Sequence, residues 1–447
     1  MPLAGLSIGK RSALLLDKEN MTKYSISPMS SLYELYLRHP RISTDSRRIE
    51  PDSVFFALRG ASFDGNRFAA DALEKGAAYA VVDDPSLPNT RPDKADRLIV
   101  VDDALQTLQT LAREHRRELG LPILAITGSN GKTTTKELVS HVLAEKYEVY
   151  ATRGNLNNHI GVPLTLLAMT RDVEFGIVEM GASACGEIAL LCSIAEPNYG
   201  IVTNIGRAHL EGFGGPEGVR RGKGELYDWL ARTGGRVFVP ANDPVLMSMA
   251  AEHETLAAEC YPTTLADGVE HHLEGDYNRF NVAAAVAVGR YFGVDDERIR
   301  YAVGSYRPDN HRSQKIRTGQ NTLILDCYNA NPSSMQASLV NFRQEPLEGC
   351  TRKILILGDM LELGDWSDAE HRHIISLAAE IPDARILLVG PHFAKAYRSL
   401  ESRPADTTLY PSQEVLAAEL RKHPVSQALI LVKGSHSIGL ERLADLL

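Results

Sequence analysis

Short apolar segments rich in Val and Ile recur along the chain, and stretches with helical periodicity separate most of them. Between residues 42 and 103, three such segments accompany one helical pattern. They are SVFFAL, YAVVDD and RLIVVDD, with FAADALEKGA between the first two. Strands that alternate with helices are typical of an α/β fold. This part of the chain is therefore predicted to form a small α/β unit.

The alternation continues beyond residue 120. A polar helical stretch over residues 104–119 leads into LPILAITGSNGKTTTKELVSHVLAEK, where an apolar strand passes through a glycine turn into a helix. The segments FGIVEMG, YGIVTNIG and GRVFVP follow, separated by helical patterns. Short, continuous apolar strands of this kind are typical of a mostly parallel sheet that is buried on both faces. A second, central domain is predicted to begin near residue 120.

Four more apolar segments, NTLILDCY, RKILILGDM, ARILLVG and QALILVKGS, alternate with helices such as SQEVLAAELRK and indicate a Rossmann-like sheet. The length of 447 residues also exceeds the roughly 250 to 300 residues that one hydrophobic core supports. We therefore predict an α/β protein of three domains, over residues 21–118, 119–313 and 314–447. Ligands are expected in the clefts between them.

Net charge and cysteine content indicate which partners and which cellular compartment to expect. The formal net charge of −9 gives no long-range attraction for nucleic acid. The five cysteines lack paired metal-ligand spacing, and an odd number disfavours a complete disulfide framework, so a cytoplasmic protein is expected. No apolar run approaches the ~20 residues of a membrane span. Residues 1–20 fit the fold pattern poorly, and Met21 is expected to be an alternative natural start.

The strongest chemical signal is TGSNGKTT, which lies between the strand ILAIT and the helix TTKELVSHVL. Glycines let backbone N–H groups turn inward, the helix N-terminus favours negative charge, a lysine reaches phosphates and a hydroxyl binds Mg²⁺. The spacing is shorter than the usual phosphate-loop pattern, and a glycine turn with a solvated lysine is the alternative. The residues assigned to nucleotide binding here are Gly128, Ser129, Asn130, Gly131, Lys132, Thr133 and Thr134.

Three residues beyond the phosphate loop are candidate metal ligands. Glu179 ends FGIVEMG, and the carboxyl edge of a parallel sheet is where the phosphate loop also lies. His209 follows the next strand, and imidazole is a less usual Mg²⁺ ligand than oxygen, so a hydrogen-bonded loop histidine is the alternative. Lys223 lies on a predicted helix and would ordinarily be a solvated lysine. Burial beside a metal would favour its neutral amine, which can react with CO₂ to form an anionic carbamate.

The motifs together resemble the Mur ligase family from residue 42 onward. TGSNGKTTTKE, NLNNHIGVPLTLL, IVEMGAS, NIGRAHLEGFGG, KGELY, YNRFNVAAAVAVG, RPDNHRSQ, LDCYNANPSSM, ILGDMLELG and LVKGS occur in the family's order. An ordered set is far more specific than one motif. The resemblance implies a central ATPase domain with a phosphate loop and an N-terminal domain that holds a UDP-sugar substrate.

The resemblance also implies roles for single residues. Lys132 and Thr133 would bind ATP phosphates and magnesium, and Glu179 and His209 would organise two Mg²⁺ ions. Lys223 would be the carbamylated lysine and the fourth metal ligand. Lys132, Glu179, His209 and Lys223 are thus the expected catalytic residues.

The nucleotide's other contacts follow from YNRFN, NHRSQ and LDCYN. Asn281, with Asn278 as its neighbour, would contact adenine, whereas without the resemblance a helix N-terminal cap is the favoured interpretation of Asn281. Arg312 and Asp326 would contact phosphate or ribose. For Asp326 alone, an ordinary turn residue at a strand end is an equal alternative.

Further residues are assigned to the substrates. STDSR and GASFDGNRF resemble the segments that hold the UDP-sugar, and hydroxyls with an arginine suit a diphosphate, although STDSR alone would favour a surface turn. The family more often has His where this chain has Asn66, Arg for His436 and Ser for Cys327. The substrate-binding candidates are Thr44, Ser46, Arg47, Asp64, Asn155, Asn157, Asn158, Asn329 and Asn331.

The implied activity is ATP-dependent addition of D-alanyl-D-alanine to a UDP-N-acetylmuramoyl tripeptide through an acyl phosphate, by a cytoplasmic monomer. NLNNHIGVP and YNANP favour this member of the family. A ligase that adds the third residue and a folylpolyglutamate synthase share the ATP site and are the nearest alternatives. A nucleotide-controlled binding protein is an alternative from another class.

Overall fold

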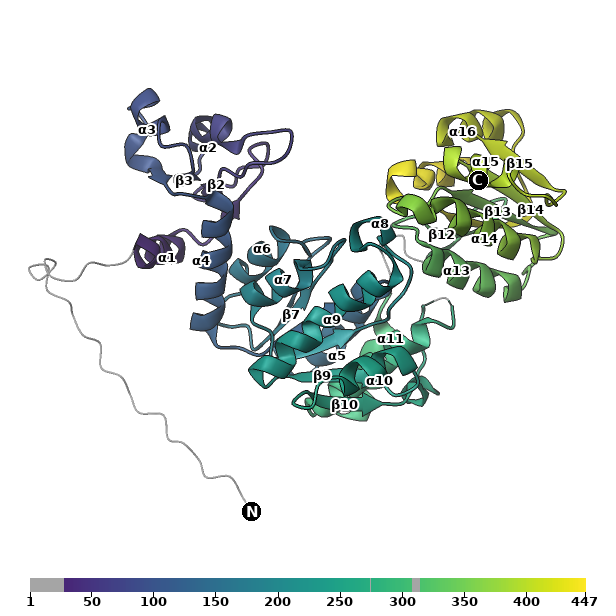
Figure 1. The fold of residues 1–447 in the computed structure, drawn as a ribbon, viewed down its shortest axis with the longest axis horizontal. Helices are drawn as coiled ribbons and strands as arrows, with labels where there is room; N and C mark the ends of the chain where they lie inside the picture. The colour runs from purple at the N-terminus through teal and green to yellow at the C-terminus, as the bar shows by residue number, and fades with distance from the viewer. Residues whose placement is uncertain (1–27, 274, 308–313) are drawn as a thin grey trace, which may run out of the picture.

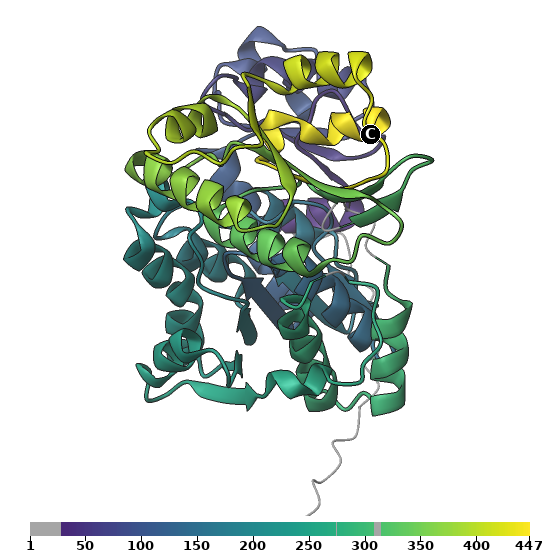
Figure 2. The same cartoon turned by 90° about the vertical axis from the view of Figure 1, so that its right-hand side faces the viewer.

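The computed structural model describes residues 28–273, 275–307 and 314–447, and within them the strands form three sheets that follow one another along the chain. Figure 1 shows the sheets in three lobes, with the central lobe between the N-terminal and C-terminal ones. In both Figure 1 and Figure 2 the C-terminal lobe lies above the central lobe. The predicted α/β architecture is confirmed.

The N-terminal lobe has a parallel sheet in the order β1–β2–β3–β4. Its strands are β1 (Ile42–Ser43), β2 (Val54–Phe56), β3 (Tyr79–Val82) and β4 (Leu98–Val100), and its helices are α1 (Pro28–Arg38), α2 (Ala69–Glu74), α3 (Leu87–Thr90) and α4 (Ala104–Leu119). A short 3₁₀ turn, η1 (Gly65–Phe68), precedes α2.

Helix α4 joins this lobe to the central one. Asp103 caps its start by accepting from the Gln106 amide, and Gly120 ends it in the left-handed conformation at φ 64°. The helix packs on central helices α6 (Gly161–Leu167) and α7 (Glu187–Ala195), and the Tyr36 hydroxyl donates to the Leu167 carbonyl at 2.6 Å. Because one apolar core continues across this joint, the N-terminal lobe is firmly attached. The boundary at 118/119 stays a prediction.

The central sheet has the order β10–β9–β8–β5–β7–β6, with parallel pairing throughout. Helices α5 (Lys132–Ala144), α11 (Asn278–Tyr291) and α12 (Asp296–Ser305) cover one face, and α6, α7 and α9 (Pro216–Thr233) cover the other. The strands are β5 (Ile123–Thr127), β6 (Val149–Ala151), β7 (Phe175–Glu179), β8 (Tyr199–Val202), β9 (Arg236–Pro240) and β10 (Ala257–Tyr261). The remaining helices of this lobe are α8 (Leu210–Phe213) and α10 (Pro244–Ala251).

Strand β5 is the position at which the order of the central sheet reverses. The chain proceeds from β5 to β6 and β7 on one side and then to β8 on the other. Ligands of open parallel sheets bind beyond the carboxyl ends of the strands at such a point. Thr127, the last residue of β5, leads directly into the phosphate loop.

The C-terminal sheet has the order β11–β12–β16–β13–β14–β15, and β11 is antiparallel to β12 at one edge. Its strands are β11 (Gln314–Arg317), β12 (Thr322–Asp326), β13 (Arg352–Gly358), β14 (Ala384–Val389), β15 (Thr407–Tyr410) and β16 (Ala428–Lys433). Its helices are α13 (Pro332–Gln344), α14 (Ser367–Ala379), α15 (Pro391–Arg398) and α16 (Gln413–Lys422). The boundary at 313/314 stays a prediction, since residue 313 lies outside the described residues.

No helix in the described part of the chain is long and apolar enough to cross a membrane.

Candidate active site

The loop between β5 and α5 requires its two glycines. Gly128 has φ 135° and Gly131 has φ 79°, conformations that side chains disfavour. A Cβ on Gly128 would lie 2.0 Å from the Thr203 hydroxyl oxygen, and one on Gly131 would lie 2.7 Å from the Asn281 amide oxygen. The loop is therefore packed tightly against residues that follow β8 and begin α11.

Asn204 and Lys132 hold the loop in shape. The Asn130 amide donates to Asn204 Oδ1 and the Ser129 amide to the Asn204 carbonyl, each at 3.0 Å. Lys132 Nζ donates to the carbonyl of Gly128 at 2.9 Å and to that of Ser129 at 3.3 Å. A cation thus lies beside the loop at the N-terminus of α5, where backbone amides and the helix dipole favour an anion.

Glu179 lies at the end of β7 beside this loop, with 2% of its surface exposed. Its Oε2 accepts from the Thr133 hydroxyl at 2.9 Å, and its Oε1 accepts from Asn157 Nδ2 at 2.8 Å. A carboxylate and a hydroxyl oxygen at this separation are hard donors of the kind that Mg²⁺ prefers. The described residues contain no group of three His, Cys, Asp or Glu side chains that could hold a metal by themselves. The residues nevertheless fit Mg²⁺ that is also held by phosphate oxygens.

His209 occupies the N-cap position before α8 and has the left-handed conformation, at φ 52°. Its Nδ1 contacts Glu362 of the C-terminal lobe in a hydrogen bond and ion pair. Burial lowers the pKa of the imidazole, an effect that Glu362 opposes and that Lys132 and Lys223 reinforce.

Lys223 is 1% exposed on α9, although lysines are almost never fully buried. Its Nζ donates to the Ala182 carbonyl at 3.0 Å and lies 5.0 Å from the centre of the Phe213 ring. Burial and the nearby charge of Lys132 lower the pKa of this amine to about 7. The amine is therefore largely neutral just above neutral pH, as carbamate formation requires.

The beginning of α11 supplies the nucleoside candidates. Asn281 Nδ2 donates to Asn278 Oδ1 at 2.8 Å, and Asn281 Oδ1 accepts from the Thr135 hydroxyl at 3.0 Å. Both asparagines line a cavity to which Tyr277 and Phe280 add aromatic rings. Asn281 does not cap α11, so the alternative interpretation of it as an N-cap is wrong: Tyr277 stands at that position.

The C-terminal lobe contacts the phosphate loop directly. Asn331 caps α13 by accepting from the Ser334 amide, and its Nδ2 donates to Asn130 Oδ1 at 2.8 Å. The Arg207 amide donates to the Ser333 hydroxyl at 2.8 Å, and the Arg207 guanidinium pairs with buried Glu370 on α14.

A cavity of about 930 Å³ lies between the central and C-terminal lobes. Predicted site residues that line it are Ser129, Asn130, Gly131, Lys132, Thr133, Thr134, Asn155, Asn157, Asn158, Glu179, His209, Asn278, Asn281, Asp326 and Asn329. Lys223 and Asn331 do not line the cavity themselves, but each bonds to a residue that does, Lys223 to Ala182 and Asn331 to Asn130. Arg312 lies outside the described residues.

The four predicted residues of the N-terminal lobe do not line this cavity. Arg47, whose side chain is 86% exposed, pairs with its neighbour Asp45, and the Ser46 carbonyl accepts from Lys75. Thr44 lies between them and β1. Asp64 caps η1 by accepting from the Asn66 amide at 3.0 Å.

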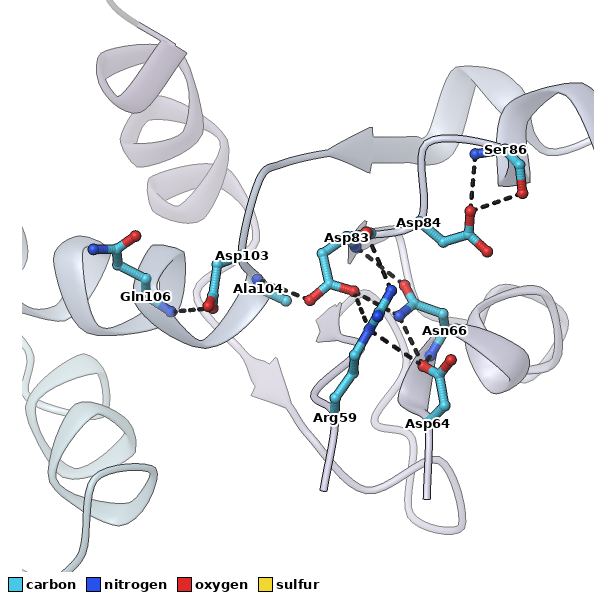
Figure 3. A network of polar contacts seen from close by, with 9 residues as sticks. All are labelled: Arg59, Asp64, Asn66, Asp83, Asp84, Ser86, Asp103, Ala104 and Gln106. Carbon is cyan, nitrogen blue, oxygen red and sulfur yellow. Dashed lines mark hydrogen bonds and ion pairs between the residues drawn. The ribbon is translucent and has the colours of Figure 1, made fainter. Parts of the chain in front are cut away.

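Asn66 has a structural position in this lobe. It is 3% exposed, and its Nδ2 donates to Asp64 at 2.8 Å and to Asp83 at 2.6 Å. Figure 3 shows Asn66 between these two carboxylates, with Arg59 bonded to Asp83. The donation from Asn66 lowers the pKa of the Asp64 carboxyl. The other Asp83 oxygen accepts from the Ala104 amide at 3.4 Å, so the network reaches the start of α4.

Sequence reasoning missed several residues that the fold brings to the site. Asn204 and Arg207 lie within NIGRAHLEG, Lys136 within TGSNGKTTTKE and Lys433 within LVKGS, so all occur in motifs that were already singled out. Lys433 is 2% exposed and pairs with Asp326. The residue type gave no signal of these partners, because each contact joins segments far apart in the chain.

Three family descriptions match successive parts of the chain. They are "Mur ligase family, catalytic domain" over residues 40–116, "Mur ligase middle domain" over 126–265 and "Mur ligase, glutamate ligase domain" over 311–436. The UDP-N-acetylmuramoyl-tripeptide--D-alanyl-D-alanine ligase of Bacillus subtilis is 34% identical over 432 residues, which cover 90% of this chain and 92% of that one. The chain belongs to the Mur ligase family.

Solved structures agree with this assignment. MurF from Acinetobacter baumannii superimposes on this Mur ligase with a TM-score of 0.79 and 30% identity, covering 91% of this chain and 93% of that one. The MurF ligase from Thermotoga maritima in complex with ADP gives 0.77 at 25% identity, covering 92% and 97%. This Mur ligase is therefore an enzyme of the ligase class with the three-lobed arrangement of those structures.

Proposed function

We propose that this Mur ligase uses ATP to join D-alanyl-D-alanine to the terminal carboxylate of a UDP-N-acetylmuramoyl tripeptide, completing a peptidoglycan precursor. One observation carries the proposal: the phosphate loop, Glu179 and the Asn329 segment of the other lobe all line one cavity. The Bacillus subtilis relative named for this reaction matches along nine-tenths of the chain, which favours it over a third-residue-adding ligase or a folylpolyglutamate synthase. The reaction requires activation of the tripeptide carboxylate, because a carboxylate does not react with an amine until it has a leaving group.

The tripeptide carboxylate attacks the γ-phosphorus of ATP, which gives an acyl phosphate and ADP. The dipeptide amine then attacks the acyl carbon, an amide bond forms and phosphate leaves. Lys132 stabilises the phosphate charge during transfer, with the amides of the loop and the N-terminus of α5. Asn278 and Asn281 hold the adenine, and Arg312 and Asp326 hold the phosphate and ribose.

Thr133, Glu179, His209 and a carbamate on Lys223 would hold two Mg²⁺ ions, which neutralise phosphate charge when bound. The support for the carbamate is the burial of Lys223 and its pKa of about 7. The hydrogen bond of 2.9 Å from the Thr133 hydroxyl to Glu179 Oε2 orients these two ligands before the substrates bind.

The substrates extend from the cavity in both directions. Asn155, Asn157 and Asn158 line its central side, and Asn329 with the adjacent Asn331 lies on the C-terminal side, where we place the incoming dipeptide. We place the UDP-sugar on the N-terminal lobe at Thr44, Ser46, Arg47 and Asp64. Closing the cavity between the lobes excludes water, which would otherwise hydrolyse the acyl phosphate.

We further propose that the enzyme acts as a monomer in the cytoplasm. All five cysteines lie in the described residues and are free thiols, as expected in a reducing compartment. The cavity is lined by two lobes of one chain, so the site does not need a second copy.

Phosphate release with Mg²⁺ and ATP tests the proposal, with the UDP-tripeptide and D-alanyl-D-alanine supplied separately and together. Release should require both substrates and should be lost in Lys132→Ala. Lys395→Ala is the matched control, because Lys395 is 70% exposed on α15 and pairs only with Asp368 among the ion pairs of the described residues. Release without either substrate would favour a nucleotide-controlled switch, and release with a folate or a single amino acid would favour a sister ligase.

A further inference from the structure

Helix α5 carries a buried lysine, Lys136, that the mechanism above does not use. Lys136 lies four residues after Lys132 and is 1% exposed. Its Nζ donates to the Thr152 carbonyl at 2.6 Å and lies 3.0 Å from Glu137 Oε1 and 3.8 Å from Glu179 Oε2. Taking an ammonium group out of water is costly unless carboxylates or carbonyls compensate it, so this position is a built site for a cation.

The neighbour that matters is Glu179. Of the two Glu179 carboxylate oxygens, Oε2 is the one that lies near Lys136, and it is also the one that accepts from the Thr133 hydroxyl. The Glu179 amide in turn donates to the Thr152 hydroxyl at 2.9 Å, and the Thr152 carbonyl is the acceptor of Lys136. Lys136 therefore contacts both the proposed metal ligand and the segment that fixes the backbone of that ligand.

We propose that Lys136 is a positioning residue that compensates the charge of Glu179 and prevents Mg²⁺ from binding there before the nucleotide. Resting on the proposed function, Lys136 would thus set the order in which Mg²⁺ and ATP bind. A fixed positive charge close to Glu179 repels a divalent cation. The phosphates of ATP bring negative charge that outweighs this repulsion, so the metal enters together with the nucleotide.

If Lys136 had only a structural role, its mutation would change Mg²⁺ affinity in the opposite direction. If Lys136 only ties Thr152 to α5, removing it loosens Glu179 and weakens Mg²⁺ binding. If it acts through charge, removing it leaves a buried carboxylate with less compensation, and Mg²⁺ alone should bind more tightly. The sign of the change in Mg²⁺ affinity, measured without nucleotide, separates the two roles.

The test is a calorimetric titration of the full chain with MgCl₂ in the absence of ATP, together with the melting temperature over the same titration. Lys136→Met should bind Mg²⁺ on the order of tenfold more tightly than the wild type, as removal of a nearby unit charge implies. Its melting temperature should rise with MgCl₂ more than that of the wild type. Lys136→Gln keeps a donor for the Thr152 carbonyl without the charge, and it should show the same two changes. This second neutral variant keeps the test valid if Lys136→Met folds poorly.

Two variants serve as controls. Glu137→Gln removes the other carboxylate near Lys136 but keeps the lysine, so Mg²⁺ alone should bind no more tightly than to the wild type. Lys136→Met/Glu179→Gln should lose the gain in affinity. Unchanged or weaker binding in both neutral variants would overturn the proposal, as would a gain that persists in the double variant. None of these readouts uses ligation, so phosphate release tests the proposed function separately.

Discussion

The contact between Arg207 and Glu370 offers a quantitative test of how the central and C-terminal lobes are held together. The Glu370 side chain is 3% exposed, whereas the Arg207 side chain is 47% exposed. Arg207→Met would therefore leave a buried carboxylate without its cation, while Glu370→Gln would leave an arginine that water can reach. Burial already raises the pKa of the Glu370 carboxyl, and Arg207 opposes this shift.

The magnitude follows from the burial of each partner. Breaking a fully buried pair costs about 3–5 kcal/mol, and the exposure of Arg207 reduces this to about 2 kcal/mol. At 1.36 kcal/mol per tenfold change, the docked state of the lobes should lose a factor of about 30 relative to the open state in Arg207→Met. Glu370→Gln should lose about 0.5 kcal/mol, as an exposed pair does.

Hydrogen exchange at the Glu211 amide measures this loss, because that amide donates across the lobes to the Glu362 carbonyl at 3.2 Å. Its exchange should be about 30-fold faster in Arg207→Met and only slightly faster in Glu370→Gln. The double variant should recover most of the protection, since it no longer buries a charge. The Met180 amide, bonded to the Ile126 carbonyl within the central lobe, is the internal control. Equal effects in the two single variants, or none in Arg207→Met, would refute the reasoning.

Two further predictions follow from the site and the N-terminal lobe. Lys223 is an ammonium below its pKa of about 7 and a neutral amine above it, so ligation in bicarbonate should rise from pH 6 to pH 8. Lys223→Arg should lose this activity at every pH, and a flat profile of phosphate release would contradict the carbamate. Asn66→Ala leaves Asp64 and Asp83 without their shared amide, so the N-terminal lobe should lose about 2 kcal/mol in urea unfolding. Exposed Asn89→Ala is its control, and equal midpoints would argue against a structural Asn66.

The interior strands were predictable because burial on both faces leaves a continuous apolar run. ILAIT coincides with β5, and FGIVEMG and GRVFVP contain β7 and β9. The edge strands of the two six-stranded sheets have no such signal. β10, at the edge of the central sheet, alternates partly buried and exposed residues, and β11 at the edge of the C-terminal sheet is largely polar. The sequence analysis named neither strand, because a strand that pairs with only one neighbour need not consist of apolar residues.

The phosphate loop and Glu179 were also accessible from the sequence. The loop requires glycines, a lysine and a hydroxyl within a few residues, and Glu179 follows an apolar strand whose end must share an edge with that loop. Helix and strand periods thus placed these groups at one edge before any contact was known.

Tertiary structure alone decided which partners these groups have. The sequence gives no reason for Asn204 to hold the Asn130 amide or for Asn331 to pair with Asn130 across two lobes. It also cannot distinguish Lys136, which is buried against Glu179, from a solvated lysine on the same helix. Local patterns fix the period, the turns and the burial of each segment. Charge compensation and contacts between lobes depend instead on residues brought together by packing, so only the folded chain determines them.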